Sequence, residues 1–196
     1  HVKTQTKINK VRLSLENKPY IDDGDGRLCN GYFNDKDQPI LAVAVGKSQE
    51  EWLPILVHEF SHMKQWEESH PYWTGLNLHL GEASDLLDEW LDGKDFKDKD
   101  IDKIIKAIIN VEYDCECRTI KLIEEFNLPI KKEVYIQKSL SYVLFYHVVK
   151  HERKWYEQKK EPYMIKDVYQ SMPKTMDINI HNPPQELLKV IKKNCF

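Results

Sequence analysis

Two histidines and a glutamate in the first third of the chain have the spacing needed to bind a metal ion and to use it. Residues 58–62 read His-Glu-Phe-Ser-His, which is an H-E-x-x-H pattern. In a helix, His58 and His62 lie one turn apart on one face, so both imidazoles can bind the same ion. Zinc binds well to nitrogen donors, and a catalytic zinc site keeps one coordination position open for water. Glu59 lies beside them, and we expect it to take a proton from that water.

Two histidines need a third protein ligand, and the downstream glutamates are the first candidates. Glu112 and Glu116 fall one turn apart on the apolar stripe of a long predicted helix, where carboxylates are rarely buried without a partner. One would bind the metal, and the other would accept a hydrogen bond from a ligating histidine. Glu82 is the alternative, although its neighbours favour a solvated helix start. Cys115 offers a thiolate, which zinc also accepts, but a buried cysteine without metal is commoner.

These motifs resemble those of the zincin metallopeptidases. The pattern at residues 58–62 is similar to the zincin signature, and Glu112 with Glu116 is similar to the E-x-x-x-D element of the gluzincins, with Glu116 in place of the usual aspartate. The resemblance implies that His58, His62 and Glu112 hold one zinc ion per chain, that Glu116 orients a zinc histidine, and that the substrate is a protein or peptide. The chain also resembles small metallopeptidase-like proteins of bacteriophages and bacteria.

A later predicted helix carries candidate residues for a supporting role in the chemistry of such a site. Zincins often use a tyrosine, histidine or arginine from another element to stabilise the oxyanion that forms on the substrate carbonyl. Tyr142, Tyr146 and His147 are the candidates here, although core packing is the commoner role of such side chains. We also expect the strand over residues 40–45 to be a sheet edge on which an extended substrate lies.

Hydrophobic periodicity and turn residues predict the elements that position these side chains. The first part of the chain reads as strands and turns, with strands near residues 11–15 and 40–45. Ser48 and Glu51 match a capping box, so the motif helix should run from about residue 48 to about residue 69. Further helices are predicted at about 81–91, 101–126, 132–158 and 185–193. The sequence therefore predicts one α+β domain over residues 1–196, with mainly strands in 1–46 and mainly helices in 47–196.

Composition and charge narrow the classes of function. The chain has 196 residues, of which 41% are hydrophobic and 31% charged, as in a globular protein. Its 29 basic and 32 acidic residues give a net charge of −3, which argues against nucleic-acid binding. The longest apolar run, residues 40–45, is far shorter than the roughly 20 residues of a membrane span. Four cysteines and no recognisable secretory signal lead us to expect a cytoplasmic protein.

Two classes of function are consistent with these residues. The first is a zinc-dependent metallopeptidase that hydrolyses peptide bonds, with Glu59 as general base. The second is a binding or inhibitor module in which the zinc site is structural or vestigial. Glu59 favours the enzyme, because a purely structural site does not need a carboxylate beside its ligands.

Overall fold

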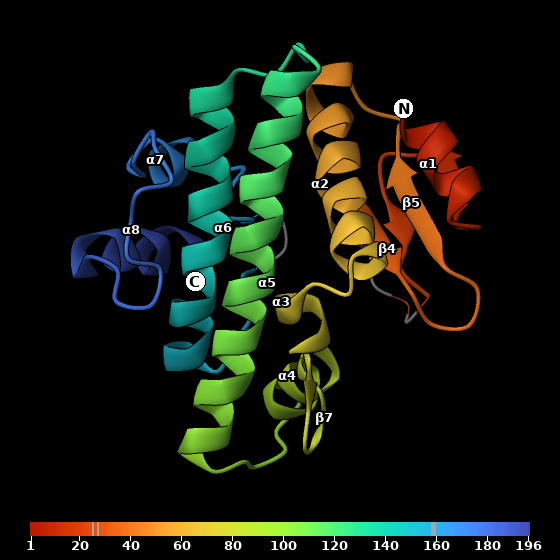
Figure 1. Ribbon diagram of the computed structural model, residues 1–196. Coiled ribbons are helices and arrows are strands. Elements are labelled where there is room, and N and C mark those ends of the chain that lie inside the picture. The colour runs from red at the N-terminus through yellow and green to blue at the C-terminus, as the bar shows by residue number, and fades with distance from the viewer. Residues whose placement is uncertain (25, 27, 158–159) are drawn as a thin grey trace. The chain divides into compact units, whose positions relative to one another are not determined.

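The architecture is α+β, as the sequence predicts. A computed structural model of the chain describes residues 1–24, 26, 28–157 and 160–196. A small mixed sheet forms near the N-terminus, and most of the remaining chain is helical (Figure 1). Among the described residues, no helix has both the length and the apolar character needed to cross a membrane.

The chain forms two compact units. The first consists of His1–Trp73 and Lys121–Ile130, and the second consists of Thr74–Ile120 and Lys131–Phe196. The single domain expected from the sequence stays a prediction.

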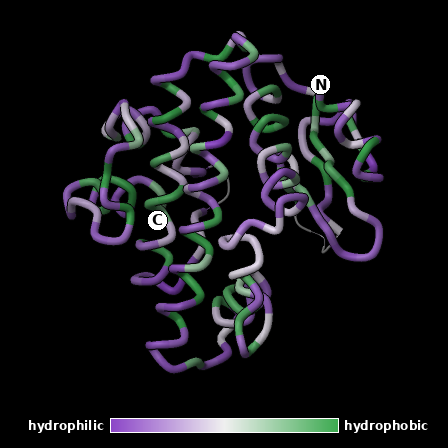
Figure 2. Tube along the Cα trace, in the orientation of Figure 1, coloured by the Kyte–Doolittle hydropathy of each residue, from purple (hydrophilic) through white to green (hydrophobic). Residues whose placement is uncertain are grey.

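The first unit is built on a three-stranded sheet in the order β1–β5–β4. Strand β1 (Arg12–Glu16) runs parallel to β5 (Ile40–Ala44), and β4 (Gly31–Asn34) runs antiparallel to β5. Strand β5 is almost entirely buried and hydrophobic along its length (Figure 2). The expectation that residues 40–45 form a sheet edge is therefore wrong, because β5 is the central strand of this sheet. A continuous apolar run is typical of a strand that is covered on both faces.

Short elements complete this part of the chain. Helix α1 (Val2–Ile8) occupies a segment where only strands and turns were expected. The hydroxyl of Thr6, its buried residue, donates to backbone carbonyls within the same helix. Strands β2 (Ile21–Asp22) and β3 (Leu28–Cys29) pair antiparallel. Seven residues are too few for helical periodicity to stand out from the sequence.

Helix α2 (Gln49–Glu67) carries the motif and packs against β4 and β5. The predicted capping box is present at its start, where the Ser48 hydroxyl lies 2.8 Å from Glu51 Oε2 and the Ser48 N–H lies 3.3 Å from the same atom. The buried face of α2 joins strand residues in one core. This core consists of Val11, Leu41, Val43, Phe60 and Met63. The four-residue α3 (Pro71–Thr74) follows.

The second unit is mainly helical. It begins with the hairpin of β6 (Asn77–Leu78) and β7 (Gly81–Glu82), which leads into α4 (Ala83–Leu91). The long α5 (Asp98–Glu125) follows, and its last turn belongs to the first unit. Helix α6 (Lys132–Glu152) packs against the short α7 (Lys166–Tyr169) and α8 (Gln185–Cys195).

Helix α6 ends six residues earlier than the sequence suggests. Arg153 adopts a left-handed conformation, with φ of 47°, and closes the helix. Its guanidinium donates to the backbone carbonyls of Trp90 and Lys94, at 3.0 and 2.8 Å. Helix periodicity could not predict this end, because it depends on a contact with a distant segment of the chain. The last residue of the predicted helix, Gln158, lies outside the described residues.

Candidate metal centre

The two motif histidines lie on one face of α2, as their spacing predicts. Their ring centroids are 4.7 Å apart, and their planes are nearly perpendicular, at 88°. His62 is only 8% exposed, and His58 is partly buried. Two imidazoles at this separation in a largely buried setting are suited to bind the same ion.

Gln65 fixes the orientation of the His62 ring. Its Oε1 atom lies 2.8 Å from His62 Nδ1. An amide oxygen can only accept, so Nδ1 carries the proton and Nε2 is the nitrogen that can bind a metal. Gln65 is fully buried, with 0% exposure. This partner was expected among the carboxylates of another helix, and Gln65 was not predicted, although its i+3 spacing from His62 is a usable signal.

Glu59 is buried where α2 approaches the edge strand β4. Its side chain is 8% exposed. A Cβ atom at Gly31 of β4 would lie 3.3 Å from Glu59 Cγ and 2.8 Å from Ile55 Cγ2, so only glycine permits this close approach of strand and helix. Burial, and then the charge of Glu59, raises the pKa of the Cys29 thiol from 9.0 to about 12. The carboxylate therefore lies close enough to Cys29 to influence its ionisation.

One aromatic ring lies beside the second histidine, and further rings pack next to that ring. The His62 ring lies 5.8 Å from the Trp73 ring, centroid to centroid. Trp73 and Trp66 each lie 5.6 Å from Phe33 of β4. The Trp73 indole N–H donates to Asp35 Oδ2 at 3.1 Å, which fixes the ring. Trp73 therefore packs against the His62 ring on one side and against Phe33 on the other.

Glu116 is buried on α5 and is held by hydroxyls of α6. Its Oε2 atom accepts hydrogen bonds from Tyr135 and from Ser139, the latter at 2.8 Å. Burial raises the pKa of Tyr135 well above 10, and the charge of Glu116 raises it further. The hydroxyl donors were not predicted. The predicted hydrogen bond from a zinc histidine to Glu116 stays a prediction.

Glu112 lies one turn before Glu116 on α5 and close to two tyrosines of α6. The hydroxyls of Tyr142 and Tyr146 are 2.9 Å apart. Burial raises the pKa of both tyrosines, and the charge of Glu112 raises both further. Both phenols therefore stay protonated. His147 directs Nε2–H to the carbonyl oxygen of Ile180, at 2.7 Å. The oxyanion role of these three residues stays a prediction.

His58, His62 and Cys115 form a group that can hold a metal ion. Each offers one ligand atom, and these atoms lie within 4.8 Å of one another. Cys115 has 0% exposure. Two imidazoles and a thiolate are donors that zinc prefers, so the chemistry of this set fits that ion.

Neither predicted third ligand belongs to this group, as far as the described residues extend. Glu112 is on the same helix as Cys115, three residues before it, and its role as a ligand stays a prediction. Glu82 occupies the N-cap position of α4, where its Oε1 accepts a hydrogen bond from the Ser84 hydroxyl at 2.7 Å. From the sequence, Cys115 was only the lesser alternative to a carboxylate ligand.

No family model, curated protein or solved structure matches this chain. The interpretation of the site therefore depends on its own residues. These are the histidine pair on α2, the buried Glu59 beside it, and the thiol and carboxyl groups of α5.

Proposed function

We propose that this protein is a zinc-dependent metallopeptidase with a gluzincin-like motif. The observation that carries the proposal is the arrangement on α2, where His58 and His62 lie one turn apart with Glu59 buried next to them. The Nδ1 contact with Gln65 leaves Nε2 of His62 as the ligand atom. A zinc site of purely structural purpose would not need Glu59.

The three motif residues of α2 each have a role under this proposal. His58 and His62 would hold the ion, and a bound zinc ion would act as a Lewis acid that lowers the pKa of water. Glu59 takes the proton of the attacking water and delivers it to the nitrogen of the leaving amine. Its burial beside β4 shields the carboxylate from bulk water.

The third ligand comes from α5 in this proposal, and two residues compete for the role. Cys115 belongs to the group whose ligand atoms lie within 4.8 Å, whereas Glu112 is the ligand implied by the gluzincin resemblance. Cobalt-substituted protein distinguishes them, because only a thiolate gives an intense sulfur-to-metal absorption band. If Cys115 is the ligand, the band is present and disappears in Cys115→Ser but not in Glu112→Gln. If Glu112 is the ligand, the band is absent.

A structural zinc site is the second candidate function. It is favoured by the complete burial of Cys115 and the near-complete burial of His62, because structural sites are closed and often contain cysteine. In that case the chain would act by binding a partner, with the metal stabilising the fold.

The variant Glu59→Gln separates the two candidates. The amide has the size of the carboxylate but cannot take a proton, and loss of a general base typically lowers the rate by about 10²–10⁴. Cleavage of a proteome-derived peptide library is measured for the parent, for Glu59→Gln and for Glu50→Gln, an exposed control on the same helix. The enzyme proposal requires cleavage by the parent and by the control but not by Glu59→Gln. A zinc-loaded parent that cleaves no peptide supports the structural site instead.

A further inference from the structure

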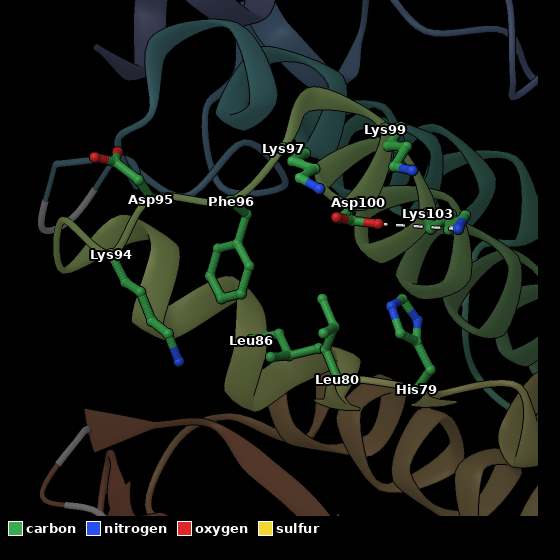
Figure 3. Close-up of a pocket in the computed structure, with 10 residues that line it drawn as sticks. All are labelled: His79, Leu80, Leu86, Lys94, Asp95, Phe96, Lys97, Lys99, Asp100 and Lys103. Atoms are coloured by element: carbon green, nitrogen blue, oxygen red, sulfur yellow. Dashed lines mark ion pairs between the residues drawn. The ribbon is translucent and has the colours of Figure 1, made fainter.

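A hollow of about 470 Å³ opens in the second unit and is lined by ten residues from the segment 79–103 (Figure 3). It lies among the β6–β7 hairpin, α4, the loop over residues 92–97 and the first turns of α5. Its volume falls within the range of about 300–1,000 Å³ that is typical of small-molecule sites. None of its lining residues belongs to the proposed metal centre.

One part of the hollow is apolar. Phe96 of the loop, Leu86 of α4 and Leu80 at the tip of the hairpin face the same space (Figure 3). Leu86 is buried, with 4% exposure, but Leu80 is 46% exposed. An apolar residue left open beside a phenyl ring provides a surface on which a flat ring can pack.

Charged side chains also line the hollow. Four lysines and two aspartates contribute to the lining. Lys94 forms an ion pair with Glu89 at 2.6 Å, and Lys103 forms one with Asp100 at 3.9 Å. Within the described chain, Lys97 and Lys99 form no ion pair. In a protein with a net charge of −3, this local excess of positive charge is suited to attract an anion.

Arg153 fixes the loop that carries Phe96. Its guanidinium donates to the backbone carbonyls of Trp90 and Lys94, and to Asp95 at 3.1 Å. The ion pair partly neutralises Asp95, whose charge would otherwise repel an anion. The same arginine also lies over the Trp90 ring, at 5.3 Å. A wall that is ordered before binding lowers the entropic cost of binding.

We propose that this hollow binds an organic phosphate of mononucleotide size. The ring would pack on Phe96, Leu80 and Leu86, and the phosphate would bind Lys97 and Lys99. Asp100, which lines the same part of the hollow, stays paired with Lys103. Phosphate rather than carboxylate is favoured because the cationic side chains of the lining are all lysines, which act as point charges on phosphate. None is an arginine, which recognises planar carboxylates in a bidentate manner.

Calorimetric titration with three compounds tests this proposal. Adenosine monophosphate carries both a ring and a phosphate, adenosine has only the ring, and inorganic phosphate only the charge. We expect adenosine monophosphate to bind at least about tenfold more tightly than either of the others, and its binding to weaken as salt is added. Amide chemical shifts should change in residues 79–103. Equal binding of the three compounds, or shifts confined to other residues, would overturn the proposal.

Two pairs of variants locate the charge. Replacing Lys97 and Lys99 together by glutamine should weaken binding of adenosine monophosphate about tenfold and leave binding of adenosine unchanged. Replacing Lys189 and Lys193 together, two exposed lysines of α8, removes the same charge elsewhere and should have no effect. Equal losses of affinity in both pairs would mean that binding depends only on the net charge of the protein, which would contradict the assignment. Tighter binding of the peptide Glu-Phe-Glu than of adenosine monophosphate would also contradict the assignment.

Discussion

At the scale of single residues, the proposed centre depends on which ring nitrogen of His62 faces the metal. The Gln65 amide oxygen settles this by accepting the Nδ1 proton. Sequence spacing was sufficient to place His58 and His62 together on one face of α2, and the role of Glu59 stays a prediction. Spacing was not sufficient for Gln65 and Cys115, because the roles of these two depend on contacts that a helical pattern does not specify.

Replacement of Gln65 should therefore weaken metal binding. In Gln65→Leu the buried Nδ1–H loses its acceptor, and loss of such a partner typically lowers metal affinity about 10–100-fold. Gln65→Glu keeps an acceptor and should retain the affinity. Competition with a chromophoric chelator measures the dissociation constant, with Gln49→Leu at the exposed start of α2 as the control. An unchanged affinity in folded Gln65→Leu would show that Gln65 does not position His62.

Cys29 should be an unreactive thiol in the folded protein. Burial and, next, the charge of Glu59 raise its pKa from 9.0 to about 12. A raised thiol pKa disfavours the thiolate, so about a thousandfold less thiolate is present at pH 8 than in an ordinary cysteine. Alkylation by iodoacetamide, followed by mass spectrometry, should be slow up to pH 9 and fast after unfolding in urea. Glu59→Gln should increase the rate, and a native rate equal to the unfolded rate would refute the shift.

At the scale of elements, the turn from β5 into α2 determines where the motif lies. Periodicity predicted both elements and the capping box at Ser48, because an apolar run and a cap are local features of the sequence. It did not predict that β5 is flanked by strands on both sides. Strand order depends on pairing between distant segments, in this case with β1 and β4.

Gly46 should be essential to that turn. A Cβ atom at this position would lie 2.5 Å from the Lys18 carbonyl carbon and 2.7 Å from its oxygen, and the backbone cannot yield as a flexible side chain can. The Gly46 N–H also donates to this oxygen, at 2.9 Å. Gly46→Ala should lower the free energy of unfolding by about 1–3 kcal/mol, as overpacking typically does.

Urea denaturation measures the effect of Gly46→Ala. The control is Gln49→Ala, a change at an exposed position three residues further along the chain. Its free energy of unfolding should stay within about 0.5 kcal/mol of the parent value. Equal stability of Gly46→Ala and the parent would mean that the chain relaxes around the added methyl group without cost.

At the scale of the whole molecule, the α+β class was predictable, because the change from strand to helix periodicity near residue 47 is strong. The division into two compact units was not, since no linker composition marks it and the boundary near residue 120 lies inside α5. The proposed metal centre would add a further term to the stability of the molecule, because an ion bound only by the folded state stabilises that state.

Zinc should raise the melting temperature of the protein. At a free zinc concentration of a hundred times the dissociation constant, the stabilisation is about 2.7 kcal/mol. For a chain of this size that corresponds to a rise of about 5–10 °C. Differential scanning calorimetry with zinc and with a chelator measures it. His62→Ala should show almost no rise, and a similar rise in parent and variant would place the stabilising ion elsewhere.

Elemental analysis of the purified protein tests the metal centre most directly. The parent, His62→Ala and His151→Ala, an exposed histidine at the end of α6, are loaded with zinc and dialysed together. We expect one zinc ion per chain in the parent and in His151→Ala, and almost none in His62→Ala. A parent that retains no zinc, or a His62→Ala variant that retains as much as the parent, would contradict a metal centre built on the histidines of α2.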